Sequence, residues 1–279
     1  MTQENRGVQM TEIQSKLIDM FGWFHDICES NNLTYYALGG TALGAVRHNG
    51  FIPWDDDIDV GMPRPDYEKL ISLSEKINCN GKYLIEYPAD KKDFVYPFIK
   101  IYDTHTTLVE NKRYKPKRGL FIDVFPIDGI GNSEEESLQN FRKINKQINM
   151  LGTRVNGFRK GRKLYKNIAV FLSRLIPEYI FDTRKLISKT ERMCKANLYA
   201  DCRFVVNAYG AWKEKEISEK AWFEERKQCH FEGKTIYIPG EYHKYLTKMY
   251  GDYMKLPPIE KRVTHHDFIH IDLSKSYME

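Results

Sequence analysis

Four aspartates gather between Pro53 and Val60, in the order Pro-Trp-Asp-Asp-Asp-Ile-Asp-Val. On an extended strand successive side chains alternate between two faces, so Asp55, Asp57 and Asp59 would share one face. Carboxylates at this density are unfavourable unless a cation neutralises them. Carboxylate oxygens are the ligands that Mg²⁺ prefers, so the run predicts a magnesium site, with Mn²⁺ as the alternative ion. A solvated acidic loop is the other interpretation.

A glycine turn precedes this run. Residues 33–38 are aromatic and aliphatic and predict a strand that ends at Gly39 and Gly40, after which residues from Thr41 to Arg47 predict a short helix. The first N–H groups of a helix have no partner within it and suit a phosphate. We therefore expect Gly39, Gly40 and Thr41 to bind the phosphates of a nucleotide beside the metal.

One acid interrupts a second apolar run, from Gly119 to Pro126. Asp123 would be buried and unpaired in a strand there, so it needs a partner. It is predicted either to complete the metal site or to act as the base towards a hydroxyl nucleophile. The alternative is a carboxylate paired with a Lys or Arg. Asp128 is expected outside this strand, as a turn residue. The predicted metal ligands are Asp55, Asp57, Asp59 and Asp123, of which Asp57, Asp59 and Asp123 are also the predicted catalytic residues.

Two cations are candidates for phosphate contacts. Arg47 ends the helix that follows the glycine turn, and Lys100 lies in an apolar strand, where a cation needs an anion. Each has an alternative as an ordinary ion pair with one of the aspartates. His48 and Trp54 flank the acidic run and are expected to shape the donor pocket. The pair at residues 265–266, two histidines, is expected to have a surface or local hydrogen-bonding role.

Composition indicates a globular protein with a sizeable core. The chain has 279 residues, of which 42% are hydrophobic and 29% charged. The N-terminus shows no signal peptide, and no apolar run is long enough to cross a bilayer. The five cysteines are scattered without the spacing of zinc ligands, which suits a reducing cytosol. We expect a cytoplasmic protein, with association at the inner face of the membrane as the alternative.

Periodicity predicts an α/β (α+β) chain. Helices are predicted from Met10, with Thr11 and Gln14 as a capping box, and after Pro65. Predicted strands and the last predicted helix cover residues 83–86, 96–102, 106–109, 231–238 and 241–250. The expected organisation is a catalytic core (1–132), a basic helical insertion (133–200) and a C-terminal part (201–279) that completes the catalytic and acceptor region.

The helical insertion is strongly basic. No acid lies between Glu136 and Glu178, whereas ten Lys or Arg do, beside an apolar run that includes Ile168, Phe171 and Leu175. This stretch is consistent with an anionic membrane surface, with a polyanionic or lipid-linked glycan acceptor, or with a solvated helix face. Nucleic acid is not expected, because the segment has no nucleic-acid-binding motif.

Four stretches of this sequence resemble the LicD family of phosphocholine transferases. They are residues 39–48, 50–59, 121–126 and 250–258, and the resemblance covers about residues 30 to 260. It implies a nucleotidyltransferase-like fold, a mixed sheet with flanking helices and a helical insertion. It also implies distant kinship with the fukutin-type enzymes, which transfer ribitol phosphate from CDP-ribitol. The gap from Gly40 to Asp57 is longer than in nucleotidyltransferases generally, but it matches this family.

The resemblance also implies an activity. The expected reaction transfers phosphocholine, or a similar phosphoalcohol, from CDP-choline or another CDP-alcohol to a hydroxyl of a cell-surface glycan, free or lipid-linked. The glycan would be of the teichoic acid, capsule or lipopolysaccharide type, and CMP would be released. A quaternary ammonium would favour an aromatic face, for which Trp54, Tyr36, Tyr96 and Tyr102 are candidates without an assigned cage. The alternatives are a nucleotidyltransferase that releases pyrophosphate and a non-catalytic glycan-binding relative.

Overall fold

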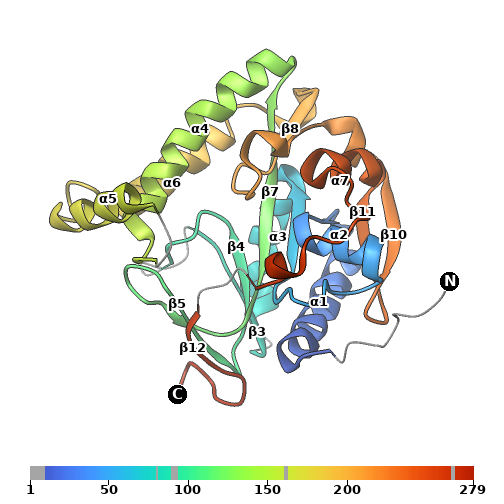
Figure 1. Cartoon of the computed structure of the whole chain (residues 1–279), viewed down its shortest axis with the longest axis horizontal. Helices are drawn as coiled ribbons and strands as arrows, with labels where there is room; N and C mark the ends of the chain where they lie inside the picture. The colour runs from blue at the N-terminus through green and yellow to red at the C-terminus, as the bar shows by residue number, and fades with distance from the viewer. Residues whose placement is uncertain (1–9, 80, 89–93, 160–162, 265–267) are drawn as a thin grey trace.

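The computed structural model describes residues 10–79, 81–88, 94–159, 163–264 and 268–279. In the described ranges, helices and strands alternate up to residue 78, five strands follow up to residue 131, and three α-helices follow up to residue 194 (Figure 1). The α-helices in these ranges are α1 (Glu12–Ser30), α2 (Gly39–His48), α3 (Arg64–Asn78), α4 (Glu134–Val155), α5 (Leu164–Leu175), α6 (Thr183–Cys194) and α7 (Tyr242–Tyr250). The strands are β1 (Tyr36–Ala37), β2 (Asp59–Pro63), β3 (Tyr83–Glu86), β4 (Ile99–Asp103), β5 (Thr107–Glu110), β6 (Lys117–Arg118), β7 (Phe121–Gly131), β8 (Phe204–Val206), β9 (Ile217–Glu219), β10 (Arg226–Phe231), β11 (Lys234–Pro239) and β12 (Phe268–Asp272).

A mixed sheet forms the centre of the described part of the chain. Its strand order is β1-β2-β7-β4-β3, and β8 joins the second half of β7 and pairs in turn with β9 (Figure 1). β2 and β7 are parallel, whereas the other pairs in this sheet are antiparallel. With 11 residues, β7 is long enough to contact β2, β4 and β8. The predicted mixed sheet with flanking helices is confirmed.

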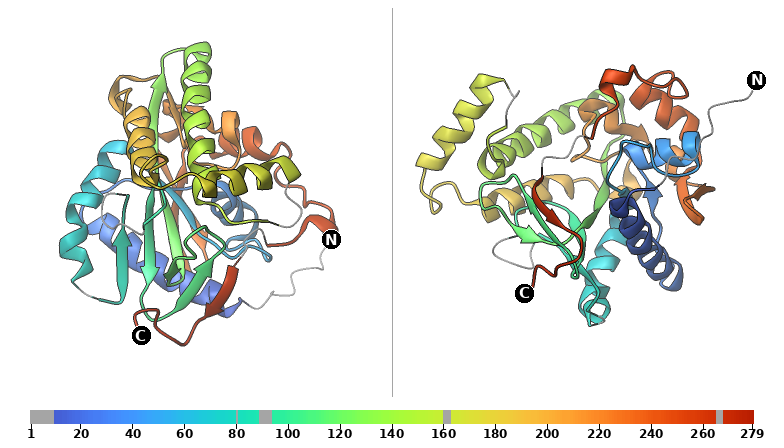
Figure 2. Two further views of the ribbon diagram at one scale, coloured as in Figure 1. Left: turned by 90° about the vertical axis from the view of Figure 1, so that its left-hand side faces the viewer. Right: turned by 60° about the horizontal axis from the view of Figure 1, so that its bottom comes forward.

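Helices α1 and α3 pack against the central sheet (Figure 2). α1 begins where the sequence predicts it, because Thr11 and Gln14 form the reciprocal capping box that satisfies two of the first N–H groups. Its apolar residues recur every three or four positions, so Leu17, Phe21 and Phe24 lie on one buried stripe. This packing gives the site a rigid support.

Helices α4, α5 and α6 form the predicted helical segment. α4 contacts both α5 and α6, and α5 lies at the outer edge of the molecule (Figures 1 and 2). A second apolar cluster joins α4 to the sheet extension, with Phe141 and Ile144 packed near Phe204 and Ile217. None of the described helices is both long and apolar enough to cross a membrane. The boundaries at residues 132 and 200 stay a prediction.

Two smaller sheets complete the structure. β12, β5 and β6 form one of them, and the hairpin of β10 and β11 forms the other, with α7 directly after it. The strands and the helix predicted over residues 231–238 and 241–250 are thus present, although β10 already begins at Arg226. All five cysteines are free.

Two strands are shorter than predicted. The stretch 33–38 contributes only β1, because the N–H of Leu33 donates to the carbonyl of Cys28 at the end of α1 and not to a neighbouring strand. The stretch 96–102 pairs only from Ile99, since Pro97 has no N–H group to donate to a ladder. Neither difference changes the strand order.

The expectation for Asp128 was wrong. Asp128 lies within β7, is 1% exposed, and forms a two-bonded ion pair with the guanidinium of Arg64 at 2.6 and 2.8 Å. A buried carboxylate is tolerated because a cation pairs with it. Arg64 is the first residue of α3, so this pair ties α3 to the middle of the sheet.

Glu216 gives the fold a testable pH dependence. It ends the 3₁₀ helix Lys213–Glu216, is 7% exposed, and accepts a hydrogen bond from the N–H of Trp212. Burial raises its pKa to about 7, although that hydrogen bond and the charge of Lys248 oppose the shift. A raised folded pKa means that Glu216 contributes fully to stability below about pH 4.3 and that this contribution is lost as pH rises through about 7.

We therefore expect Glu216→Gln to stabilise the protein at pH 8 by up to about 3 kcal/mol and to have little effect at pH 4. The amide keeps the acceptor for the Trp212 N–H and removes the buried charge. Urea denaturation of both proteins between pH 4 and pH 8 measures the difference. An equal effect at both ends of the range would contradict the prediction.

Candidate active site

Charged side chains form a row across the central sheet. Asp59 at the start of β2 pairs in register with Asp123 on β7, and Asp123 pairs with Lys100 on β4. Residues paired across neighbouring strands point to the same face of a sheet. Glu86 on β3 extends the row and is neutralised by the guanidinium of Arg118 at 2.9 Å. The strand positions next to these residues are apolar and buried, so the row lies on one face: Val60, Ile85, Ile99, Ile101, Ile122 and Val124.

Lys100 is the cation within this row. It is 2% exposed, and its Nζ lies 2.7 Å from Oδ1 of Asp123 and 3.9 Å from Oε2 of Glu110. The hydroxyl of Tyr96 also donates to Glu110. The structure therefore shows the ion-pair alternative for both Lys100 and Asp123. A phosphate contact of Lys100 and a metal contact of Asp123 stay predictions.

The acidic run does not form a strand before Asp59, so the expectation of three aspartates on one strand face was wrong. Asp55 and Asp57 lie in the loop between α2 and β2, where the N–H of Asp55 donates to the carbonyl of Ile52 and closes a turn. The side chain of Gln14 in α1 donates to the Asp55 carbonyl at 2.8 Å. Asp is a poor strand former, and neighbouring like charges repel, which favours a loop tied to adjacent helices.

The glycine pair belongs to the first turn of α2, which begins at Gly39 and not at Thr41. A Cβ on Gly40 would lie 2.6 Å from Oδ2 of Asp55, so only glycine allows the acidic loop to approach this closely. Gly39 has a φ of 51°, a left-handed conformation that glycine adopts without strain. The hydroxyl of Thr41 accepts the N–H of Asp59 at 2.9 Å and so fixes the start of β2 against the helix.

The N-terminus of α2 therefore meets the carboxylates. A Cβ on Gly39 would lie 3.9 Å from Oδ2 of Asp59, and Asp55 is in direct reach of Gly40. The positive end of the helix dipole stabilises negative charge at this position. The carboxylates of Asp55 and Asp59 lie at the same helix end where a phosphate was expected. Phosphate contacts of Gly39, Gly40 and Thr41 therefore stay predictions.

The surroundings of Asp59 disfavour the charged form of its carboxyl group. Burial, and next the charges of Asp57, Asp123 and Asp55, raise the pKa of Asp59 well above its usual range, and Lys100 offsets this only in part. Burial also raises the pKa of Asp123 despite the charge of Lys100 beside it. Burial and the neighbouring carboxylates thus outweigh the attraction of Lys100 for Asp59, and a further cation would favour the charged form of Asp59.

The donor atoms of the site aspartates bear on whether a divalent ion binds here. An all-oxygen set of aspartates fits a hard cation such as Mg²⁺ or Mn²⁺. Within the residues that the structure describes, however, no three His, Cys, Asp or Glu side chains converge as a complete metal site does. Mg²⁺ held by Asp55, Asp57, Asp59 and Asp123 stays a prediction that rests on donor type and repulsion.

Arg47 and His48 lie at the opposite end of α2 from its glycine pair. Eight residues of helix separate Arg47 from Gly39 by about 12 Å along the axis. Arg47 donates to the carbonyl of Tyr253 at 2.8 Å and to the ring of His48 at 3.0 Å, and burial lowers the pKa of both Arg47 and His48. The half-buried ring of Trp54 lies under the guanidinium of Arg262 at 5.6 Å. Their predicted substrate contacts stay predictions.

Several residues of this region were not identified from the sequence. The hydroxyl of Tyr245 accepts the N–H of Gly39 at 3.0 Å, and a Cβ on Gly39 would lie 3.8 Å from the hydroxyl of Tyr250. No local pattern marks Tyr245, which α7 brings over α2. Glu110 had a signal related to that of Asp123, since it is an acid at the end of an apolar strand, but it was not predicted as a site residue. The paired histidines at 265–266 lie outside the described residues.

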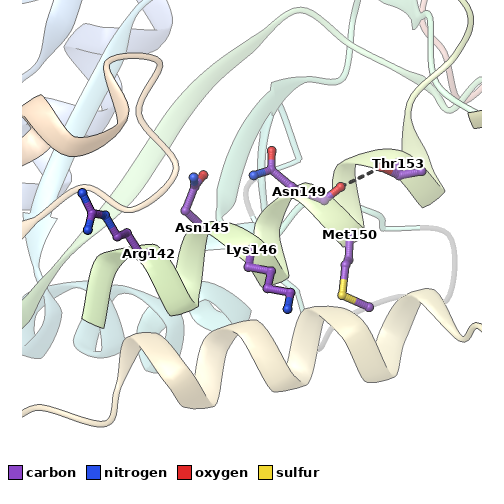
Figure 3. Close-up of a pocket in the computed structure, with 6 residues that line it drawn as sticks. All are labelled: Arg142, Asn145, Lys146, Asn149, Met150 and Thr153. Atoms are coloured by element: carbon purple, nitrogen blue, oxygen red, sulfur yellow. Dashed lines mark hydrogen bonds between the residues drawn. The ribbon is translucent and has the colours of Figure 1, made fainter. Parts of the chain in front are cut away.

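A shallow groove on α4 lies apart from this row. It has a volume of about 400 Å³, and the residues along it all come from one face of α4 (Figure 3). They are Arg142, Asn145, Lys146, Asn149, Met150 and Thr153. The groove contains none of the predicted site residues.

Comparison with known proteins defines the class. Residues 32–149 match the family model described as "LicD/FKTN/FKRP, nucleotidyltransferase domain". This range includes α2, β2, β4 and β7, hence every element that carries the charged row and the glycine pair. The fold of this range is therefore that of a nucleotidyltransferase domain.

Relatives extend the similarity along the chain. This chain is 30% identical over 261 residues to the lipopolysaccharide cholinephosphotransferase LicD of Haemophilus influenzae. The match covers 92% of this chain and 96% of that protein. The chain is also 30% identical to an uncharacterized protein of Rickettsia prowazekii, over 39% of this chain and 48% of that protein. An uncharacterized protein of Rickettsia typhi is 33% identical, over 39% of this chain and 41% of that protein. The chain belongs to the LicD family, and this homology supports a transferase.

Removal of charge at Asp59 tests the electrostatics. Because its pKa is raised in the folded state, the carboxyl contributes most to stability below about pH 4 and loses that contribution as pH rises. We expect Asp59→Asn to raise the melting temperature of the metal-free protein at pH 7 by on the order of 3 °C and to have no effect at pH 4. Added Mg²⁺ should stabilise the wild type more than the variant.

Thermal denaturation with EDTA and with Mg²⁺ gives both quantities. Asp19→Asn, at an exposed aspartate of α1, is the matched control. It should change neither the melting temperature of the metal-free protein nor the increase that Mg²⁺ produces. A lower melting temperature for Asp59→Asn without metal would show that repulsion is not the dominant interaction of this side chain.

Proposed function

We propose that this protein is a Mg²⁺-dependent transferase that moves phosphocholine, or a similar phosphoalcohol, from a CDP-activated donor to a hydroxyl of a cell-surface glycan and releases CMP. One observation supports it above the others. The carboxylates of Asp55 and Asp59 meet the N-terminus of α2 in a chain that matches a lipopolysaccharide cholinephosphotransferase over 92% of its length. The five free cysteines are consistent with a reaction in the cytoplasm.

The donor diphosphate is the group that this site suits. The N-terminus of α2 presents N–H groups beside a concentration of carboxylates, which is the combination that a phosphate and its metal need. Asp55, Asp57, Asp59 and Asp123 would hold Mg²⁺, or Mn²⁺, which neutralises charge on the phosphates. Gly39 and Gly40 keep this space open, because a Cβ on Gly40 would meet Asp55.

Proton removal from the acceptor hydroxyl needs a base in the same row. Asp59 and Asp123 are both half-buried, and burial raises the pKa of each, which makes a carboxylate a stronger base at neutral pH. Lys100 holds the Asp123 carboxylate in a fixed orientation through its 2.7 Å contact. We propose Asp123 or Asp59 as the base, with Lys100 as a positioning residue.

Trp54 is the favoured aromatic face for a choline group. Tyr36, Tyr96 and Tyr102 are each at most 5% exposed, whereas Trp54 is half-buried. The guanidinium of Arg262 lies 5.6 Å from the centre of the Trp54 ring, and this contact with a cation supports the proposal. The acceptor, by analogy with the relative's printed name, is a lipopolysaccharide-type glycan, and teichoic acid and capsule are the other classes.

The second candidate is a nucleotidyltransferase that transfers the nucleotide and releases pyrophosphate. The description of the matching family model, which names a nucleotidyltransferase domain, favours it. The two reactions differ in which phosphorus is attacked. The identity of the small product therefore separates them.

Product analysis tests the proposal. The protein is incubated with Mg²⁺, candidate glycans and, as donor, either one of a panel of CDP-alcohols or CTP, and CMP and pyrophosphate are measured. We expect CMP from one donor, and a loss of about 1,000-fold in turnover for Asp57→Asn and for Asp59→Asn. Asp19→Asn should retain full activity. Pyrophosphate as the product would establish the second candidate, and unchanged rates in both variants would exclude the acidic site.

Substitution of Trp54 tests donor recognition. Trp54→Leu should raise KM for CDP-choline about tenfold, because the cation–π contact is lost, and Trp54→Phe should recover part of it. KM for an uncharged alcohol donor such as CDP-glycerol should not change. Equal effects on both donors would indicate that Trp54 shapes the pocket without contacting the ammonium.

A further inference from the structure

Helix α5 presents its apolar side to the outside of the molecule. In an ordinary surface helix the apolar stripe faces the core. In α5 the inward residues are Val170 and Ser173, at 2% and 4% exposure. The large apolar side chains recur at positions i, i+1, i+4, i+7, i+8 and i+11, which is one stripe of a helix, and all are exposed: Leu164, Tyr165, Ile168, Phe171, Leu172 and Leu175.

The orientation of α5 is fixed by buried polar contacts. Arg154 of α4 is fully buried and donates to the carbonyl of Ser173 and, at 3.0 Å, to that of Ile176. The hydroxyl of Ser173 donates to the carbonyl of Val170 within α5 at 2.7 Å and has the carbonyl of Thr153 of α4 as a second, longer contact at 3.1 Å. If α5 rotated to bury its stripe, these groups would lose their partners, at a cost for each buried polar group. The outward stripe is therefore a feature of the folded state.

The apolar surface continues past the end of α5. Tyr179 and Ile180, in the turn before α6, are 79% and 65% exposed, and Phe158, before α5, is 43% exposed. Figures 1 and 2 show that this part of the chain lies at the outer edge of the molecule, where no other element covers it. Monomeric soluble proteins rarely expose so many adjacent large apolar side chains, which indicates an interaction surface.

The charge of the segment identifies the partner. No acid lies between Glu136 and Glu178, and Lys163 and Lys166 of this segment are exposed. Among the residues that the structure describes, no ion pair engages either lysine. In a symmetric dimer through this surface, two copies of the same basic patch would face each other and repel. An anionic lipid surface matches both properties, since the stripe enters the acyl boundary and the lysines contact the headgroups.

We propose that α5, together with residues 176–180, is a membrane-docking surface that binds anionic bilayers and holds this protein at their surface without spanning them. The docking surface contains no residue of the active site, so this proposal does not depend on the proposed transfer reaction. A helix with an apolar stripe on one side and basic residues around it is typical of interfacial membrane binding.

Vesicle co-sedimentation of the full chain tests this surface. Wild-type protein should bind vesicles of phosphatidylcholine with phosphatidylglycerol and bind vesicles of phosphatidylcholine alone much more weakly. The double variant Phe171→Gln, Leu175→Gln should lose at least about tenfold in partitioning. The double variant Lys163→Gln, Lys166→Gln should lose about tenfold or more on anionic vesicles only, and added salt should have the same effect on the wild type.

Matched controls use exposed residues elsewhere. Leu198→Gln, at a 67% exposed leucine, and Lys244→Gln, on α7, should leave binding unchanged. All variants should keep the wild-type circular dichroism spectrum, because the substituted side chains are exposed. Absence of wild-type binding to anionic vesicles, or binding by both double variants as strong as that of the wild type, would overturn the proposal. A dimer that Phe171→Gln, Leu175→Gln abolishes, without lipid binding, would assign the surface to a second copy of the chain.

Discussion

Repulsion between carboxylates on neighbouring strands is the constraint around which the site is built. Asp59 and Asp123 face each other in register across β2 and β7, and the loop before β2 adds Asp55 and Asp57. Two features offset this repulsion within the chain. Lys100 contacts Asp123 from β4, and the N-terminus of α2 meets Asp55 and Asp59. Both require the strand order β2-β7-β4 with α2 leading into β2, so the electrostatics and the topology depend on each other.

The same constraint connects the site to function. Compensation is incomplete, because the pKa of Asp59 remains raised with Lys100 in place. A surplus of carboxylate oxygens on a rigid sheet edge suits a hard cation and a polyphosphate. A buried ion pair between Arg64 and Asp128 ties α3 to β7 further along the strand, away from the half-buried aspartates of the site. β7 thus carries two ion pairs, that of Asp128 with Arg64 in the core and that of Asp123 with Lys100 at the site.

Local patterns account for the elements that sequence predicted well. The capping box of α1, the helices of residues 133–200 and the strand of Tyr83–Glu86 follow from periodicity and from side chains close in sequence. The glycine pair and the acidic run were identified as a site because their residue types are unusual. The conformation of that run was predicted wrongly, because residues 55–58 form a loop and not a strand with alternating faces. Contacts with other elements favour the loop: the side chain of Gln14 in α1 donates to the Asp55 carbonyl, and the Asp55 carboxylate lies against Gly40 of α2.

The sequence by itself determined the class of side chains at the site, the family resemblance and the basic, acid-free segment, because these depend on composition and on short-range spacing. Only the tertiary structure decided the partners: Lys100 with Asp123, Arg64 with Asp128, Tyr245 with Gly39, and the outward direction of the apolar stripe on α5. The physical reason is that pairing and burial depend on strand order and helix orientation. Residues 64 positions apart, as Arg64 and Asp128 are, carry no local sign of their contact.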